Sequence, residues 1–148
     1  MQEHDVTLMH LSSLNRATRA LVENGYAPDA VMKVREAVGF LVDEVHVHNS
    51  HEEAALFPVL ERYVEGPTDV MREEHRMLKK ELRKLRTATG KLGPGRPTAA
   101  TLRAVRASAQ SVIQKFVNHI HKENNILFPL VQKFLTRDAL REIARRLV

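Results

Sequence analysis

Two segments of the chain carry the same seam of apolar residues, and one His and one Glu interrupt each seam at the same place. The positions follow the 4,3 spacing that marks one face of an α-helix. The first seam comprises Val34, Val38, Leu41, Val45, His48, Glu52, Ala55 and Val59, and the second comprises Val105, Ala109, Val112, Phe116, His119, Glu123, Ile126 and Leu130. An offset of 71 residues superimposes His48 on His119, Glu52 on Glu123, and residues 56–58 on residues 127–129, which both read Leu-Phe-Pro. The chain therefore contains two copies of one long helix with polar residues on its buried face.

Gly and Pro divide the sequence into segments of helical periodicity, and no alternating strand pattern competes with it. The breaks are Gly25 with Pro28, Gly66-Pro67, and the stretch from Gly90 to Pro97. They predict helices at about 4–24, 28–65, 69–89 and 98–135, and a short fifth helix at about 137–147. Gly25 is expected just after the first helix, Pro28 in the first turn of the second, Thr68 or Asp69 as N-cap of the third, and Thr136 as N-cap of the fifth. Short connections make the first four antiparallel neighbours, so we predict an all-α, up-down-up-down four-helix bundle.

The composition fits one domain covering 1–148, because 43% hydrophobic residues in 148 are enough for one core. The sequence has no Cys, which excludes disulfides, zinc–thiolate sites and thiol catalysis. The N-terminus has no targeting pattern, and no window is apolar for long enough to cross a bilayer. We therefore expect a cytoplasmic protein without a membrane partner.

The formal net charge is +5, and the basic residues form two clusters. They are Lys79, Lys80, Arg83, Lys84 and Arg86, and then Arg137, Arg141, Arg145 and Arg146. Such clusters can contact phosphates, but basic residues interleaved with Glu are also typical of solvated helix faces. No aromatic residues and no nucleic-acid-binding motif accompany them. A nucleic-acid partner is therefore not favoured.

The first and third predicted helices each place one His in the apolar seam. The seams are Thr7, His10, Leu14, Ala17 and Leu21 in the first helix, and Met71, His75, Leu78, Leu82 and Leu85 in the third. The interior of the bundle would then receive four imidazoles and two carboxylates. Burying these groups without partners would cost about 1–3 kcal/mol for each neutral group and several for each charge, against a net stability of about 5–15 kcal/mol. We therefore predict that metal ions satisfy them.

The spacing along the helices supports a shared site. His48 with Glu52, and His119 with Glu123, are i,i+4 pairs that project from one helix face. With a rise of about 1.5 Å per residue, His10 lies about 22 Å before Gly25 and His48 about 30 Å after Pro28. The difference is about one and a half turns, which crossing angles can absorb. Such ligands suit iron, zinc, copper or nickel; iron is preferred because six protein ligands leave two octahedral ions with a position for a small ligand.

The remaining His residues are assigned other places. His46 and His121 lie two residues from a selected His, which turns them about 200° away from the site. His51 is at i+3 from His48 and is a candidate hydrogen-bond partner of a ligand or an alternative ligand. His4 lies near a fraying terminus and is expected to be solvated.

These motifs resemble the hemerythrin-like, or HHE cation-binding, family over about residues 5–135. The resemblance is carried by His10 in Leu-Met-His-Leu, by residues 48–58 (His-Asn-Ser-His-Glu-Glu-Ala-Ala-Leu-Phe-Pro), by Glu-Glu-His at residues 73–75, and by residues 119–129 (His-Ile-His-Lys-Glu-Asn-Asn-Ile-Leu-Phe-Pro). It implies a four-helix bundle that holds two iron ions as a non-haem di-iron centre with oxo or hydroxo and carboxylate bridges. The terminal ligands would be His10, His48, His75 and His119, and the bridges Glu52 and Glu123.

The chain departs from the oxygen-carrying members of this family. Glu123 stands where they have a His, and Lys79, at i+4 from His75, cannot be a ligand while it is charged. Proteins that repair damaged iron centres share the two H-x-x-x-E pairs but carry an N-terminal Cys-containing segment. Because this chain has no Cys, we do not expect thiol-dependent repair.

Three functions follow from the sequence. The first is a di-iron protein that binds or reacts with a small oxidant such as oxygen, peroxide or nitric oxide. The alternative is a non-catalytic sensor or carrier of oxygen, iron or redox state that acts through a partner. The third is a basic helical module that binds nucleic acid without metal, and its binding would be salt-sensitive. The sequence does not indicate an oligomeric state.

Overall fold

The computed structural model describes residues 2–93 and 95–147, and helices account for most of them. Three residues lie outside the described part: Met1 and Val148, at the ends of the predicted domain, and Pro94, in the loop before the fourth predicted helix. The elements in order are α1 (Gln2–Asn24), α2 (Pro28–Glu44), the π-helical segments η1 (Val45–Asn49) and η2 (Glu52–Leu56), α3 (Phe57–Leu60), α4 (Pro67–Gly90), α5 (Ala99–Lys122), the π-helical segment η3 (Glu123–Leu127), α6 (Phe128–Phe134) and α7 (Arg137–Arg146). No strand occurs among the described residues, so the predicted all-α class is confirmed.

Several helix ends lie where local chemistry predicts them. Gly25 follows the last residue of α1 with a φ of 85°, a conformation that costs Gly little because it has no Cβ. Pro28 opens α2, where its fixed φ suits the first turn. At the start of α7, the Thr136 hydroxyl accepts a hydrogen bond of 3.1 Å from the Ala139 amide. These local signals therefore set where α1 ends and where α2 and α7 begin.

The prediction for the start of α4 was wrong. Neither Thr68 nor Asp69 is the N-cap, because α4 begins at Pro67 and Gly66 precedes it with a φ of 103°. The Thr68 hydroxyl instead donates to the Glu61 carboxylate at 2.8 Å. The preceding helix also ends earlier than predicted, at Leu60 rather than near residue 65.

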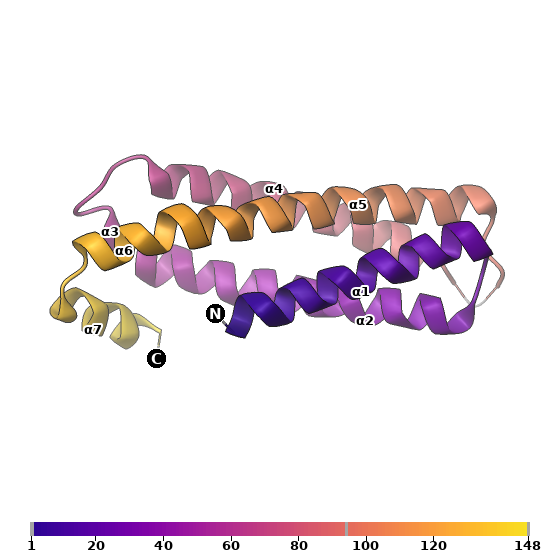
Figure 1. Cartoon of the computed structure of the whole chain (residues 1–148), viewed down its shortest axis with the longest axis horizontal. Coiled ribbons are helices and arrows are strands. Elements are labelled where there is room, and N and C mark those ends of the chain that lie inside the picture. Colours follow the sequence, from indigo (N-terminus) through magenta and orange to yellow (C-terminus); the bar gives the residue numbers. More distant parts are fainter. Residues whose placement is uncertain (1, 94, 148) are drawn as a thin grey trace.

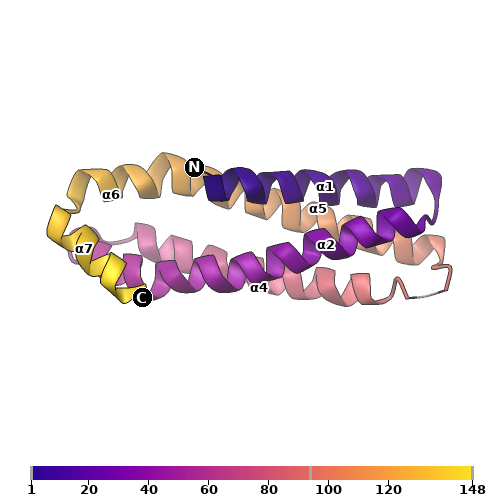
Figure 2. The ribbon, with the colours of Figure 1, turned by 90° about the horizontal axis from the view of Figure 1, so that it is seen from below.

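The helices form an antiparallel bundle in which α1 packs on α2 and α5, and α4 packs on the same two neighbours. Figures 1 and 2 show α1 covering only part of the bundle's length, while α2 with α3 and α5 with α6 extend beyond it. The first turn of α1 lies near the middle of the bundle, beside the region where α5 leads into α6 (Figure 2). The short helix α7 folds back at the far end and contacts η2.

The π-helical segments η2 and η3 are related by the same 71-residue offset as the two seams, and each is followed by a Pro in the next turn. A Pro inside a helix removes one N–H donor and its ring clashes with the preceding turn, and a wider turn before it relieves this. In η3 the extra residue of the π-turn moves the seam on by one position, whereas Ala55 of η2 keeps its buried place. As a result Leu127 is fully buried, whereas Ile126, which the sequence placed in the seam, is 48% exposed.

The core consists of two apolar clusters with a polar layer between them. The larger cluster joins α1, α2, α4 and α5 and includes Leu14, Leu41, Leu85 and Val112. The smaller one comprises Phe57, Leu60, Met71 and Leu127 at the far end. The polar layer is therefore shielded from both ends of the bundle. None of the described helices is long and apolar enough to cross a membrane.

Candidate metal centre

Six polar side chains meet in the layer between the apolar clusters. We call this set the His/Glu cluster; it comprises His4, His48, Glu52, His75, His119 and Glu123. Five of them are buried to 6% exposure or less, and the His48 side chain retains 22%. Of the residues selected from the sequence, the structure brings together five: His48, Glu52, His75, His119 and Glu123.

His10 is not part of the cluster, and His4 occupies the place predicted for it. The His10 ring stacks on Phe40 of α2, with 3.8 Å between ring centroids and an interplanar angle of 11°. His4, which was expected to be solvated, is only 6% exposed. The two side chains differ in direction and in height, because six positions along α1 turn His10 about 120° away from His4. His4 lies about 31 Å before Gly25, which matches the height of His48, whereas His10 lies about 22 Å before it.

Glu123 lies between two groups of imidazoles. Its Oε1 is 2.8 Å from Nε2 of His119, and its Oε2 is 2.7 Å from Nε2 of His4. The same Oε2 lies 3.5 Å from Nε2 of His48. One carboxylate thus offers its two oxygen atoms in two directions, as a bridge between two sites requires.

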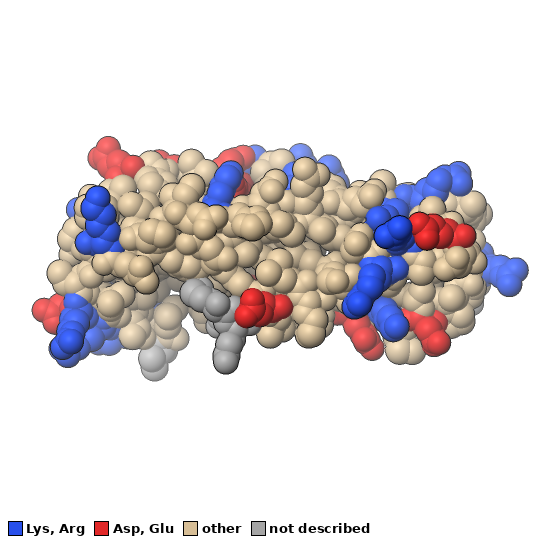
Figure 3. Space-filling view, viewed as in Figure 1, with Lys and Arg blue, Asp and Glu red and all other residues tan. Residues whose placement is uncertain are grey.

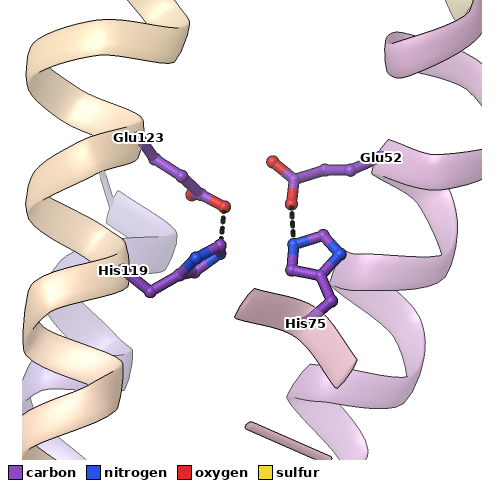
Figure 4. A group of neighbouring side chains, drawn as sticks. All are labelled: Glu52, His75, His119 and Glu123. Carbon is purple, nitrogen blue, oxygen red and sulfur yellow. Dashed lines mark ion pairs between the residues drawn. The ribbon is translucent and has the colours of Figure 1, made fainter. Parts of the chain in front are cut away.

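Glu52 faces Glu123 across the interior, and Figure 4 shows Glu52 beside His75 and Glu123 beside His119. Oε1 of Glu52 lies 3.1 Å from Nε2 of His75 and 3.5 Å from Nε2 of His48. The rings of His75 and His119 meet edge to face, with 4.9 Å between their centroids. The cluster therefore divides into a group of Glu52, His75, His119 and Glu123, and a group of His4, His48 and Glu123, with Glu123 in both.

The imidazoles direct Nε2 into the cluster and Nδ1 toward a second layer of oxygen atoms. Nδ1 of His75 donates to Glu53 at 2.9 Å, and Nδ1 of His119 donates to Glu74 at 2.8 Å. Nδ1 of His4 donates to the side-chain oxygen of Asn124 at 2.9 Å. Nδ1 of His48 lies 4.0 Å from Glu44. A proton held on Nδ1 leaves the lone pair of Nε2 directed inward, which is how His residues are oriented toward metals.

The internal repeat extends to residues that the sequence analysis did not select. Glu53 and Asn124 each follow the Glu of an H-x-x-x-E pair, and each accepts from a His on a neighbouring helix. The Phe residues of the two Leu-Phe-Pro motifs also correspond. Phe57 stacks on His75 and Phe128 stacks on His4, with centroid separations of 5.6 and 5.7 Å. The 71-residue offset was the signal that could have identified both pairs.

The electrostatics of the cluster couple imidazoles to carboxylates. Burial disfavours a charged imidazole, but the facing Glu123 and Glu52 carboxylates outweigh it and raise the pKa of His48 to about 9. Burial likewise lowers the pKa of His119, but the Glu123 carboxylate outweighs burial, so this pKa is also raised. Burial raises the pKa of Glu52, whereas the imidazoles around Glu123 outweigh its burial and hold its pKa far below the usual range. Without a metal, protons on the imidazoles would balance the carboxylates.

The donor set fits metal ions better than it fits protons. Nε2 of His75 and of His119, both oxygens of Glu52 and Oε1 of Glu123 are buried and make no hydrogen bond with another described residue. Nε2 of His119 nevertheless lies 2.8 Å from Oε1 of Glu123, and Nε2 of His75 lies 3.1 Å from Oε1 of Glu52. Ligand atoms about 2.1 Å from one ion and at right angles to each other are about 3 Å apart. The cluster therefore already has the edge lengths of a coordination sphere made of nitrogen and oxygen.

The remaining His residues lie outside the cluster. His46, His51 and His121 are exposed, in agreement with the interpretation of His46 and His121 as surface groups. The sequence left His51 as a hydrogen-bond partner of a ligand or an alternative ligand. In the structure His51 belongs to neither group of the cluster.

The fold and this polar layer together define a helical-bundle protein with a buried centre of the type that binds cations. The chain belongs to the family described as the hemerythrin HHE cation-binding domain, whose model matches residues 1–131. The family that the sequence motifs resemble is thereby confirmed.

Curated relatives carry a more specific name. The chain is 36% identical over 93 residues to the iron-sulfur cluster repair protein YtfE of Musicola paradisiaca, an alignment covering 60% of this chain and 42% of that protein. It is 29% identical over 110 residues to the proteins of the same name from Yersinia pseudotuberculosis and Yersinia pestis, covering 72% of this chain and 50% of theirs. The chain thus spans about half the length of the curated relatives it matches.

Proposed function

We propose that the His/Glu cluster holds two iron ions and that the protein binds or reacts with a small oxidant such as oxygen, peroxide or nitric oxide. The observation that carries this proposal is the pair of groups that share Glu123. His75 and His119 would serve one ion, His4 and His48 the other, and Glu52 and Glu123 would lie between them. When bound, such an ion pair would supply redox chemistry and an electrophilic position for the oxidant.

The protein's own contribution is to orient and shield the donors. Glu53, Glu74 and Asn124 hold Nδ1 of three imidazoles and so fix the direction of Nε2. Phe57 and Phe128 cover two of these rings and limit the access of water. His48 has the most exposed side chain of the cluster, so a small ligand would approach from its side.

The decisive test is metal analysis of protein purified without added metal, with absorption spectra under air and after reduction. About two iron ions per chain and a spectrum that changes on reduction support the proposal. Zinc in place of iron, or no bound metal, would refute it. Turnover of peroxide or nitric oxide by the iron-loaded protein then separates a reactive centre from the alternative, a non-catalytic sensor or carrier.

The names of the YtfE relatives favour a second candidate, a role in iron–sulfur cluster repair. Because the alignments cover about half of those proteins, the matched part accounts for the cation-binding domain and not for a whole repair protein. Restoration of a damaged iron–sulfur enzyme by the iron-loaded chain, compared with the same amount of free iron, would test this role.

The nucleic-acid hypothesis gains no support from the face formed by α1 and α5. On that face the Lys and Arg side chains gather toward the two ends, and the middle is largely uncharged (Figure 3). A nucleic-acid backbone would require a continuous basic band.

A further inference from the structure

A cavity of about 500 Å³ lies between the α2–η1 segment and α4, beside the His/Glu cluster. The buried His75 and the more exposed Glu53 are among its lining residues, and Val45 and Leu82 form apolar parts of its wall. The volume is within the range of small-molecule sites, about 300–1,000 Å³. The proposed function uses His75 but assigns no role to this cavity.

One face of α4 lines the cavity with cations at the spacing 4,3,4,3. They are Arg72, Arg76, Lys79, Arg83 and Arg86. Arg72 and Arg76 are paired with Glu61 and Glu73. The other three form no ion pair with another residue in the described part of the chain, whereas Lys80, on the outer side of α4, does not line the cavity. The basic cluster of the sequence is thus split, and one part of it is directed at the cavity.

A buried donor also lines the cavity. The Asn49 side chain is 8% exposed, and its Nδ2 finds no acceptor among the described residues. An unsatisfied buried amide costs about 1–3 kcal/mol, so an acceptor that reaches it is favoured. Asp43, on the α2 side of the cavity, forms no ion pair with another described residue. The three unpaired cations of α4 outnumber this one carboxylate, so the lining keeps a net positive charge.

We propose that this cavity binds a small organic anion, a carboxylate or phosphate group on a short apolar skeleton. Lys79 and Arg83 would pair with the anionic group, the Asn49 amide would donate to one of its oxygen atoms, and Val45 with Leu82 would contact the skeleton. Because Glu53 and His75 line the cavity, the bound anion would lie next to a His of the cluster and the carboxylate that orients it. The site goes beyond the proposed function and does not require a metal.

Calorimetric titration of the full-length protein with benzoate, at constant ionic strength, tests the proposal, and benzamide serves as the neutral molecule of the same shape. We expect benzoate to bind and benzamide to bind at least about tenfold more weakly. The double variant Lys79→Gln, Arg83→Gln should lose about tenfold in affinity for benzoate. The matched variant Lys80→Gln, Arg103→Gln removes the same charge elsewhere and should bind as the unmodified protein does.

Equal binding of benzoate and benzamide, equal effects of the two double variants, or no binding of benzoate would each overturn the assignment. Binding of an acidic peptide without binding of benzoate would show a peptide groove instead and would also overturn it. In metal-depleted protein, the Asn49 side-chain amide signal in ¹H–¹⁵N NMR spectra should shift with benzoate. Absence of iron would refute the proposed function but would leave the outcome of these titrations unaffected.

Discussion

His4 and Glu123 lie 119 positions apart in the chain, and their side chains meet at 2.7 Å in the interior of the bundle. The contact ties the first turn of α1 to the junction of α5 and η3. The contact therefore gives the first turn of α1 a partner in the interior of the bundle. The predictions below depend on this contact and on those around it.

Replacing His4 by Ala should lower the metal content by about one ion per chain, because it removes a donor from the group shared by His48 and Glu123. The melting temperature of the metal-loaded protein should fall with it. His10→Ala is the matched control, since His10 stacks on Phe40 away from the cluster. Elemental analysis and thermal unfolding of both variants decide the matter; loss of metal in His10→Ala with retention in His4→Ala would contradict the assignment.

Glu74→Gln should weaken metal binding by about 10–100-fold without abolishing it. The Glu74 carboxylate accepts from Nδ1 of His119 and also pairs with Lys122, so the neutral amide would hold the imidazole less firmly. Competition with a chelator of known affinity measures the change. Glu73→Gln, on the neighbouring exposed residue that pairs with Arg76, should leave the affinity unchanged, and an equal loss in both variants would argue against an orienting role.

Glu123→Ala should destabilise the metal-free protein by about 3–5 kcal/mol, because removing one partner of a buried ion pair leaves the other uncompensated. The residue is 1% exposed and faces His4 and His119. Urea unfolding followed by circular dichroism gives the free energy. Glu65→Ala, on an exposed residue, should change it by less than about 0.5 kcal/mol. A similar small effect for Glu123→Ala would mean that its ion pairs do not stabilise the fold.

The metal-free protein should lose stability as the pH rises from about 6.5 to 9. The pKa of His48 is raised to about 9 in the folded chain, and its ordinary value is about 6.5. Stability from a raised pKa is complete below the unfolded value and is lost as the pH passes through the folded value. Metal binding should improve over the same interval because protons no longer compete for Nε2. Unfolding free energies and metal affinities measured at several pH values test both trends. If stability and metal affinity rose or fell together with pH, the proposed competition between protons and metal at Nε2 would be refuted.

The order of residues alone predicts the helical class, the approximate helix positions and five residues of the His/Glu cluster. Helices require a local period and local end signals, and both are present in the order of residues: Gly25 and Pro28 end and begin helices where they were expected. The repeat of His48 and Glu52 at His119 and Glu123 also predicts that each His lies beside its Glu, because i,i+4 pairs share a helix face in any packing.

The choice between His4 and His10 depends on how the helices pack. Thr7, Leu14 and Leu21 of α1 share a stripe that either His4 with Leu11 or His10 with Ala17 continues at 3,4 spacing, so the sequence pattern alone leaves both His residues open. They differ by about 120° in direction around α1 and by about 9 Å in height, and the way α1 is set against α2 and α5 determines which of them faces the cluster. The same is true of Glu53 and Asn124, whose partners lie on other helices. Local spacing fixes the direction in which a side chain leaves its helix, whereas the packing of helices fixes which side chains meet.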